Sequence, residues 1–313
     1  MDKGRIGILV PQPSPAETLA SIERAEDLGV SAVWLTTGFG MPDALTLYAA
    51  AAVRTKTIKL GTFIVPTFPR HPLVMAQQAE VIANLAPGRL ILGVGISHRS
   101  IMADTFGLPY ERPLEHLREY VTVLTAALHR GAVGFDGARF RVHAQVPHPA
   151  PVPVMISSLR VNSFRITGAL ADGALPWLCP APYLRDVALP AMGEGAASAN
   201  RPVPPLIPGV PVVLSEDPAE AARAARKHLR LYLRMPFYVG TLVAAGFPEA
   251  QQGEWSDRML DGLVIHGSEG TVAARLQSFL ATAGADQLVA SFLPTGSDGK
   301  AGLERAMRLV ASL

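Results

Sequence analysis

Residues 58–96 read IKLGTFIVPTFPRHPLVMAQQAEVIANLAPGRLILGVGI, and this stretch decides the fold. Two short apolar runs, 58–65 and 90–96, stand on either side of a longer amphipathic segment. The runs are continuously apolar instead of alternating, which is typical of parallel strands that are buried on both faces. A buried helix segment can give the same pattern, but the short lengths and the flanking turns favour strands. This stretch therefore predicts one strand–helix–strand unit.

The same pattern extends along the whole chain, in eight apolar runs separated by amphipathic stretches. The other six runs are 5–10, 32–36, 152–157, 173–178, 209–214 and 287–293. Helix start signals stand between the runs. Ser14, for example, precedes Pro15 and has Glu17 three residues on, which forms a capping box. Repeated strand–helix units imply right-handed crossovers and a parallel sheet.

Eight such units, with no visible boundary to a second domain, favour a closed (β/α)8 TIM barrel over an open doubly wound sheet. We therefore expect one domain over residues 1–313. Three stretches exceed a minimal barrel. Residues of about 99–113 follow strand four as a candidate lid, about 133–151 form a hairpin with an extended arm before strand five, and about 235–269 add at least one helix before strand eight.

The composition argues against several classes of protein. Hydrophobic residues make up 49% of the chain and charged residues 17%, which argues against disorder. The net charge is only +2 and no basic cluster is interleaved with aromatics, so we expect no nucleic-acid partner. The longest apolar run, 44–53, is too short to cross a membrane. The single cysteine, Cys179, cannot form an intrachain disulfide, so a reducing compartment, the cytoplasm, is the simplest expectation.

In a parallel barrel, chemistry takes place at the C-terminal ends of the strands and in the loops behind them. The predicted strand ends carry no ring of Asp, Glu and His for a metal, no carboxylate pair and no lysine. Hydroxyls, one amide, small residues and an aromatic remain, and such a set suits a planar cofactor that carries the reaction. The candidates are Gln12, Thr36, Thr37, Thr62, Ile64, Gly95, Ser97, His98, Ser157, Ser158, Leu159, Arg160 and Trp177.

The glycines at 93 and 95 invite comparison with a dinucleotide-binding fingerprint, but the match fails. The third glycine position is His98, and both glycines lie inside the predicted strand. Glycines in a barrel strand either relieve crowding or let a flat ring approach the barrel mouth. Both interpretations stay open.

The stretch SSLRVNS at 157–163 is the best candidate for an anion site. It joins strand five to the next helix, where free N–H groups and the helix dipole favour a phosphate. Arg160 adds positive charge there, and Arg165 is a second candidate. The alternative interpretation is an ordinary helix start that is capped by Asn162 or Ser163.

His98 is the only histidine at a predicted strand end, and it is our leading candidate for a proton donor at neutral pH. Gln12 and the Thr37 hydroxyl are alternative donors, and a solvated or structural histidine is the plain alternative. For Trp34 we expect packing in the core. Cys179 has no neighbouring base that would make it a nucleophile.

Three blocks of the sequence, 60–97, 106–129 and 151–173, resemble the bacterial luciferase-like oxidoreductases. The specific features are the spaced set Pro66, Arg70, Pro72, Ala76, Gly88-Arg89 and Gly93-x-Gly95-x-Ser97, and the segment LPYERPLEHLREY at 108–120. Within that family, LADG at 170–173 followed by PWLCPAPYLRDVALPAMGEGAA is most similar to the branch that uses the deazaflavin coenzyme F420.

The resemblance implies several properties of the site. Thr62, Ser97 and residues 157–160 match cofactor-binding positions of the family, and a non-prolyl cis peptide is implied in strand three, near Gly61–Thr62. Some members carry a catalytic histidine or aspartate directly behind strand two, where this chain has TTG at 36–38. Reduction of a substrate therefore fits this chain better than oxidation of an alcohol. The family also implies a homodimer.

Together these features predict an F420-dependent oxidoreductase, in the direction of a reductase, that transfers a hydride between the deazaflavin and a small organic substrate. The ring would lie across the barrel mouth, with its phosphate at 157–160 and residues 99–113 as a lid. Two alternatives stay open: a luciferase-like monooxygenase that uses FMN, and a barrel that binds a flavin without turnover.

Overall fold

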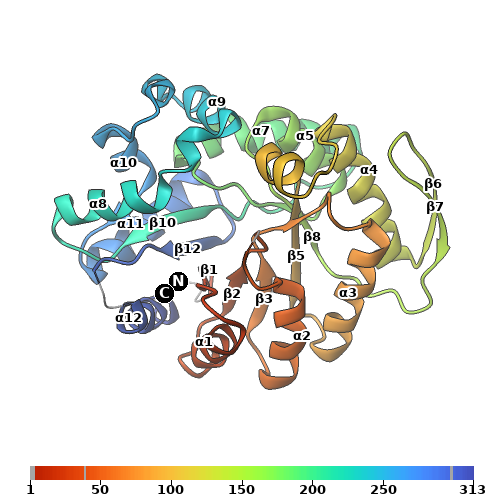
Figure 1. Cartoon of the computed structure of the whole chain (residues 1–313), viewed down its shortest axis with the longest axis horizontal. Coiled ribbons are helices and arrows are strands. Elements are labelled where there is room, and N and C mark those ends of the chain that lie inside the picture. The colour runs from red at the N-terminus through yellow and green to blue at the C-terminus, as the bar shows by residue number, and fades with distance from the viewer. Residues whose placement is uncertain (1–3, 39, 297–298) are drawn as a thin grey trace.

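A parallel β-sheet that closes on itself forms the centre of the computed structural model, which describes residues 4–38, 40–296 and 299–313 (Figure 1). Its strands are β1 (Ile6–Leu9), β2 (Ala32–Leu35), β3 (Lys59–Thr62), β4 (Val65–Pro66), β5 (Leu90–Gly95), β8 (Val154–Ile156), β9 (Gly173–Ala174), β10 (Gly209–Val213), β11 (Ile265–His266) and β12 (Leu288–Phe292). Among the described residues they pair in the order β11-β10-β12-β1-β2-β3-β5-β8-β9, with β4 beside β5.

Two isolated bridges close this sheet. Ala174 pairs with Leu206 and Trp177 pairs with Gly209, so the β9 end of the sheet meets the start of β10. The amide of Gly209 donates to the carbonyl of Pro176 at 2.8 Å. Each of the eight predicted runs contains a strand, and the eight are neighbours in chain order. The predicted (β/α)8 barrel is therefore confirmed.

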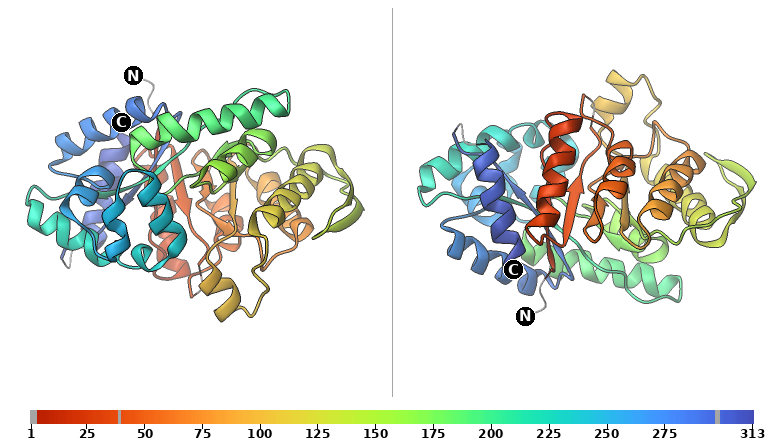
Figure 2. Two further views of the ribbon diagram at one scale, coloured as in Figure 1. Left: turned by 90° about the horizontal axis from the view of Figure 1, so that it is seen from above. Right: turned by 90° about the horizontal axis from the view of Figure 1, so that it is seen from below.

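Helices surround the sheet, as the two views of Figure 2 show from opposite sides. They are α1 (Pro15–Asp27), α2 (Ala44–Arg54), α3 (Pro72–Leu85), α4 (Pro113–Thr125), α5 (Val161–Leu170), α6 (Ala181–Tyr183), α7 (Leu189–Ser198), α8 (Pro218–Leu229), α11 (Glu269–Ala283) and α12 (Gly299–Ala311). The π-helical segments η2 (Ala126–Arg130) and η3 (Leu184–Ala188) extend α4 and precede α7. No helix in the described ranges is long and apolar enough to cross a membrane.

The N-cap half of the predicted capping box starts α1. The Ser14 hydroxyl accepts the amide of Glu17 at 3.3 Å and donates to the Glu17 carboxylate at 2.9 Å. Pro15 occupies the first helical position, where a missing N–H costs no hydrogen bond. Interactions between residues close in sequence thus determine where α1 begins.

Each of the three predicted extra stretches carries secondary structure of its own. The π-helical segment η1 (Ser100–Thr105) follows β5, and β6 (Ala132–Asp136) pairs with β7 (Arg141–Gln145) in the predicted antiparallel hairpin. Between α8 and β11 lie η4 (Tyr232–Arg234), α9 (Pro236–Ala244), η5 (Pro248–Gln252) and α10 (Asp257–Leu263). Glu119 of α4 accepts the amides of Ala138, Arg139 and Phe140 at 2.8–3.0 Å, which holds the hairpin turn against the barrel.

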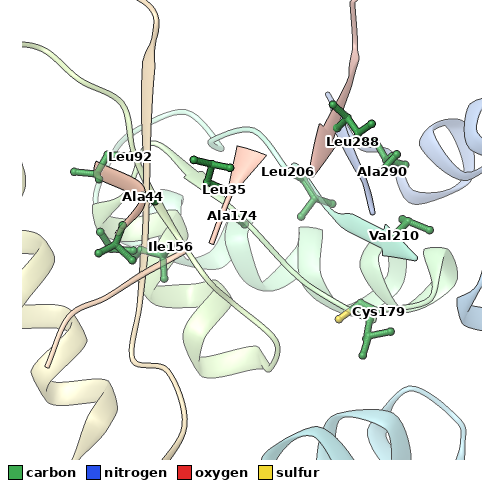
Figure 3. Close-up of a cluster of buried hydrophobic side chains, with 14 of the residues drawn as sticks. Leu35, Ala44, Leu92, Ile156, Ala174, Cys179, Leu206, Val210, Leu288 and Ala290 are labelled. Atoms are coloured by element: carbon green, nitrogen blue, oxygen red, sulfur yellow. The ribbon is translucent and has the colours of Figure 1, made fainter. Parts of the chain in front are cut away.

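The hydrophobic core has two layers. The larger layer lies between the sheet and the helices, and Figure 3 shows part of it, including Leu35, Leu92 and Ile156. The smaller layer includes Trp34, Phe63, Leu175 and other apolar side chains contributed mainly by the strands. Trp34 is buried there, as we expected, and it packs edge-to-face on Phe63 with ring centroids 6.1 Å apart.

A cis peptide bond joins Phe63 to Ile64, between β3 and β4. The family resemblance implied such a bond near Gly61–Thr62. A non-prolyl cis peptide is therefore present as implied, and it lies two residues further along the chain.

Candidate functional site

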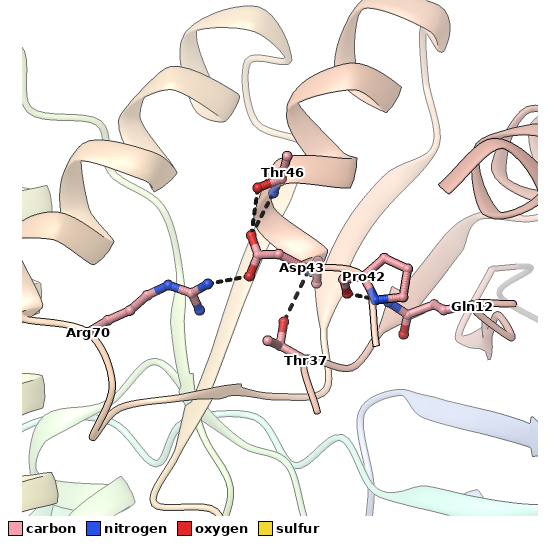
Figure 4. Close-up of polar contacts among 7 residues, drawn as sticks. Gln12, Thr37, Pro42, Asp43, Thr46 and Arg70 are labelled. Atoms are coloured by element: carbon pink, nitrogen blue, oxygen red, sulfur yellow. Dashed lines mark hydrogen bonds and ion pairs between the residues drawn. The ribbon is translucent and has the colours of Figure 1, made fainter. Parts of the chain in front are cut away.

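Hydrogen bonds behind β1 and β2 tie three predicted site residues into the loop that leads to α2, and Figure 4 shows two of them, Gln12 and Thr37. The Gln12 amide group donates to the Pro42 carbonyl at 3.2 Å and accepts the backbone N–H of Thr36 at 3.1 Å. The Thr37 hydroxyl accepts the amide of Ala44 at 3.2 Å. Gln12 and Thr37 therefore use hydrogen-bonding groups to shape this loop.

Asp43 and Arg70 form an ion pair that joins this loop to the one behind β4 (Figure 4). Asp43 also caps α2, because its carboxylate accepts the amide and the hydroxyl of Thr46 at 2.9 and 2.8 Å. Burial alone would raise the pKa of Asp43, but the bonds from Thr46 and the charge of Arg70 outweigh it and hold that pKa below its ordinary value. The carboxylate is therefore a fixed anion, already paired.

Thr62 lies below the barrel mouth. Its side chain is fully buried, and its hydroxyl donates to the carbonyl of Gly93 and accepts the amide of Gly93, both at 2.8 Å. Because these bonds join β3 to β5, the hydroxyl does not face a ligand. The structure thus gives no support to a cofactor contact through the Thr62 hydroxyl.

The glycines of β5 are required by crowding. A Cβ on Gly93 would lie 2.0 Å from the carbonyl oxygen of Thr62. A Cβ on Gly95 would lie 2.9 Å from the Cβ of Ser157 and 3.1 Å from Ile64. Gly95 therefore lets Ile64, which stands between β3 and β4, and Ser157, which follows β8, both pack against the end of β5.

An unusual backbone turn follows β5. Ser97 has a positive φ of 57°, which non-glycine residues rarely adopt and which is often found at functional sites. Its carbonyl accepts the hydroxyl of Tyr110 at 3.2 Å, so the 99–113 insertion is tied back to the strand end. His98 follows, and its carbonyl accepts the amide of Met102 at 2.9 Å at the start of η1. Burial lowers the pKa of the His98 ring, which favours the neutral form.

A second group of rings packs beneath the loop behind β4. Phe68 stacks on His116 with centroids 3.9 Å apart and on Tyr110 with centroids 4.9 Å apart. The His116 ring nitrogen Nε2 is 3.1 Å from the Thr67 hydroxyl. Burial, and then the charge of Arg139, lower the pKa of His116 to about 4 against the opposing charge of Glu119. His116 is thus a neutral packing residue that supports the loop.

The predicted anion site is a helix start with an added cation. Arg160 is the N-cap residue of α5, and the Ser163 hydroxyl accepts the amides of Leu159 and Arg160, both at 3.2 Å. The N-cap residue is thus Arg160 instead of the predicted Asn162 or Ser163. Ser163 stands at the third helical position and accepts backbone amides of the residues before the helix. The amides of the first helical turn have no intrahelical partner.

The neighbours of this helix start differ in their exposure. Ser158 is fully buried, and its hydroxyl lies 2.7 Å from that of Thr167, so it supports α5 from below. Arg160 is exposed and makes no ion pair within the described ranges. Its Nη1 lies 3.5 Å from the place that a Cβ on Gly240 would occupy, so positive charge stands between α5 and α9.

Trp177 belongs to a row of rings that runs up from the barrel interior. It packs against Phe63 below, at 6.3 Å between centroids, and against Tyr232 above, at 6.1 Å. Tyr232 packs on Tyr238 at 4.7 Å, and Tyr238 packs on His98 at 5.7 Å. Two predicted site residues, His98 and Trp177, are thus joined through two tyrosines of the stretch before strand eight.

The sequence interpretation missed several residues of this region. Asp43 follows a proline directly before a helix, which is a signal for a cap that we did not use. Arg70 was noted only for its resemblance to the family. No local pattern marks Tyr232 and Tyr238, because their neighbours depend on the path of the 231–264 segment.

Two further features bear on what the site can do. The described residues contain no group of three or more His, Cys, Asp and Glu side chains that could hold a metal ion. A groove of about 540 Å³ lies between α8 and α10, with His266 among its lining residues, and no predicted site residue lines it.

Comparisons with known proteins agree with this fold. Residues 2–287 match the family model described as luciferase-like monooxygenase. The chain is 31% identical, over 73% of each sequence, to an F420-dependent glucose-6-phosphate dehydrogenase of Beutenbergia cavernae. It is 24% identical to a 5,10-methylenetetrahydromethanopterin reductase of Archaeoglobus fulgidus, over 94% of this chain and 95% of that one.

The fold also matches a solved structure, that of the coenzyme F420-dependent tetrahydromethanopterin reductase from Methanopyrus kandleri. The TM-score is 0.78 at 23% identity, over 99% of this chain and 98% of the other. At this level of identity the likeness concerns the fold. Since the family model spans most of the sequence, the chain belongs to the luciferase-like monooxygenase family.

Proposed function

We propose that the protein is an F420-dependent oxidoreductase that reduces a small organic substrate. Among the relatives, the glucose-6-phosphate dehydrogenase of Beutenbergia cavernae is named as F420-dependent. The observation that carries the proposal in this structure is Arg160, an exposed cation at the start of α5 with no ion pair in the described ranges.

The residues at the mouth fit the cofactor. The coenzyme carries a phosphate, and the first turn of α5 offers backbone N–H groups, the positive end of the helix dipole and Arg160. Ile64, Gly95 and Ser157 form a compact surface next to it. This surface and the Trp177 ring would hold the flat deazaflavin.

When bound in its reduced form, F420 supplies a hydride, and the chain has to supply orientation and a proton. His98 is the residue that we assign to the proton, since it follows the turn at Ser97 and its ring faces α9 through Tyr238. Gln12 and Thr37 remain secondary candidates, because both already use hydrogen-bonding groups to hold the loop behind β2.

The direction of the reaction rests on the loop behind β2. This loop has Thr36 and Thr37 where some relatives carry a catalytic acid or base. The carboxylate that lies nearest in this loop, Asp43, is engaged with Arg70 and Thr46. With no free base there, removal of a proton from an alcohol lacks its catalyst, and reduction is the favoured direction.

An anaerobic assay of reduced F420 with a panel of carbonyl and unsaturated compounds tests this proposal. We expect oxidation of the coenzyme that needs a substrate and does not need oxygen. Oxygen consumption with reduced FMN would support a monooxygenase instead. Binding of either cofactor without turnover on any panel member would support a flavin-binding barrel.

We further propose that the chain acts as one domain and as a homodimer in the cytoplasm. Val74, Val81 and Leu85 lie on one face of α3 at helical spacing, and each is 45–54% exposed. Val53 at the end of α2 is exposed as well. Such a face suits a second copy. Val81→Asp should convert a dimer into monomers in analytical ultracentrifugation, and a wild-type monomer would refute the assembly.

A further inference from the structure

The stretch from η4 to α9 lies across the C-terminal ends of three neighbouring barrel strands. Tyr238 contacts His98 behind β5, and Gly240 faces the guanidinium of Arg160 behind β8. Just before α9, Tyr232 contacts Trp177 behind β9. The stretch from η4 to α9 therefore stands over the part of the mouth where the proposed cofactor and proton donor meet.

Four rings contact one another in a row, which we call the aromatic wall: His98, Tyr238, Tyr232 and Trp177. Consecutive ring centroids along it are 5.7, 4.7 and 6.1 Å apart. Tyr238 is buried and Tyr232 and Trp177 are partly buried. The side chains come from two strand ends and from one insertion, so the wall exists only because the insertion folds back over the barrel.

The wall carries no charge at neutral pH. Burial raises the pKa of Tyr238 well above its ordinary value, and the neighbouring Tyr232 and Cys179 add to the rise. Burial also raises the pKa of Tyr232. The pKa of His98 is lowered by burial, which keeps that ring neutral. A charged substrate would lose hydration against this surface without gaining a partner.

We propose that the aromatic wall binds an uncharged, ring-bearing carbonyl substrate, and that Tyr238 is its main specificity-determining residue. This inference rests on the proposed function and names its substrate class. Rings prefer edge-to-face or offset contacts with other rings, which this surface offers. Arg160, a cation that faces Gly240 of α9, is assigned to the cofactor phosphate.

The reaction on such a substrate balances without a further reagent. The hydride adds to the carbonyl carbon, the C=O π bond breaks, and the oxygen takes a proton from water or from the fraction of His98 that is protonated. The substrate gains two electrons, and reduced F420, the reductant, loses them. The product is an uncharged alcohol, so the reaction leaves no charge on the bound molecule.

The test compares acetophenone with 4-acetylbenzoate, which has the same ring and ketone and adds one carboxylate. Binding is measured by ligand-detected NMR, first on the protein alone and then on the F420-loaded protein. We expect acetophenone to bind the loaded protein at least tenfold more tightly than 4-acetylbenzoate. Equal or reversed affinities would overturn the inference.

Three variants separate the role of the wall from a general loss of structure. Tyr238→Ala should weaken acetophenone binding at least tenfold, and Tyr238→Phe should keep it within about threefold. Phe237→Ala is the matched control, because Phe237 lies on the same helix and is 42% exposed. It should change the dissociation constant less than twofold. Thermal unfolding of each variant shows whether α9 is still folded.

The outcomes distinguish this inference from the proposed function. If F420 fails to bind while the affinity for acetophenone still depends on Tyr238, the proposed function is wrong and the aromatic wall is still a ligand-binding surface. If F420 binds and acetophenone binds equally well to wild type and Tyr238→Ala, the wall is not the substrate surface. Tyr238→Leu, which keeps apolar volume without a ring, replaces Tyr238→Ala if the alanine variant unfolds.

Discussion

Trp34 of β2 occupies the space that a side chain on Gly61 of β3 would need. A Cβ on Gly61 would lie 2.4 Å from Cε3 of the indole ring. Gly7 of β1 stands in the same relation on the other side, with a Cβ position 2.6 Å from the indole Nε1. The two glycines thus let one large ring fill this level of the barrel interior.

Gly61→Ala should therefore destabilise the fold. Overpacking of a closely packed core costs typically about 1–3 kcal/mol, so the free energy of unfolding should fall by about that amount in urea titrations. Gly270→Ala in the first turn of α11 is the control, because no atom lies within 4 Å of its Cβ position. If both variants unfold at the same urea concentration, the steric account of Gly61 is wrong.

Arg160→Ala should weaken F420 binding about tenfold or more while the fold stays intact. A hydrogen bond from a charged donor to an anion contributes roughly 1.5–3 kcal/mol. Arg165→Ala is the matched control on the same helix, since Arg165 is paired with Glu194 at 2.6 Å. An unchanged dissociation constant for Arg160→Ala would leave the loop as a plain helix start.

His98→Gln should slow anaerobic single-turnover hydride transfer by roughly 10²–10⁴-fold, the range typical of a positioned acid. Burial lowers the pKa of His98, so its protonated form becomes available only below the ordinary value. The wild-type rate should therefore rise as the pH falls through that lowered pKa, and the variant should lose this dependence. A loss smaller than about fivefold, with equal cofactor binding, would make His98 a bystander.

His116 should make the stability of the protein depend on pH. Its pKa is lowered to about 4 in the folded state, so the unfolded chain takes up a proton first as the pH falls below 6.5. Stability is fully present above that pH and is lost between about 6.5 and 4, by up to about 1.4 kcal/mol per pH unit. His116→Asn should flatten this slope in urea titrations. The same slope in both proteins would show that another group is responsible.

Much of the fold could be predicted from the sequence because its signals are local. The runs at 58–65 and 90–96 are apolar except for Lys59 and Thr62, since parallel strands are covered on both faces. The N-cap contact of α1, from Ser14 to Glu17, lies within four residues, and the β6–β7 hairpin within fourteen. The barrel is closed by the bridges from Ala174 and Trp177 to the 206–209 segment. Their position follows from the order of the eight strand–helix units along the chain.

The site was harder to predict, because strand-end position does not say which way a side chain points. Thr62 ends β3, yet its hydroxyl bonds to Gly93 inside the barrel. Tyr238 lies far from His98 in sequence and reaches it only through the path of the inserted segment. Contacts of this kind depend on tertiary packing, for which neither hydrophobic periodicity nor turn chemistry carries a signal.

The most direct test of the account is a binding titration of the cofactor-free protein with F420 and with FMN, followed by tryptophan fluorescence. Trp177 packs at the mouth while Trp34 is buried in the barrel, so Trp177→Phe should remove most of the signal change. The account predicts that F420 binds at least tenfold more tightly than FMN, a difference of about 1.4 kcal/mol. FMN binding tenfold more tightly than F420 would contradict it.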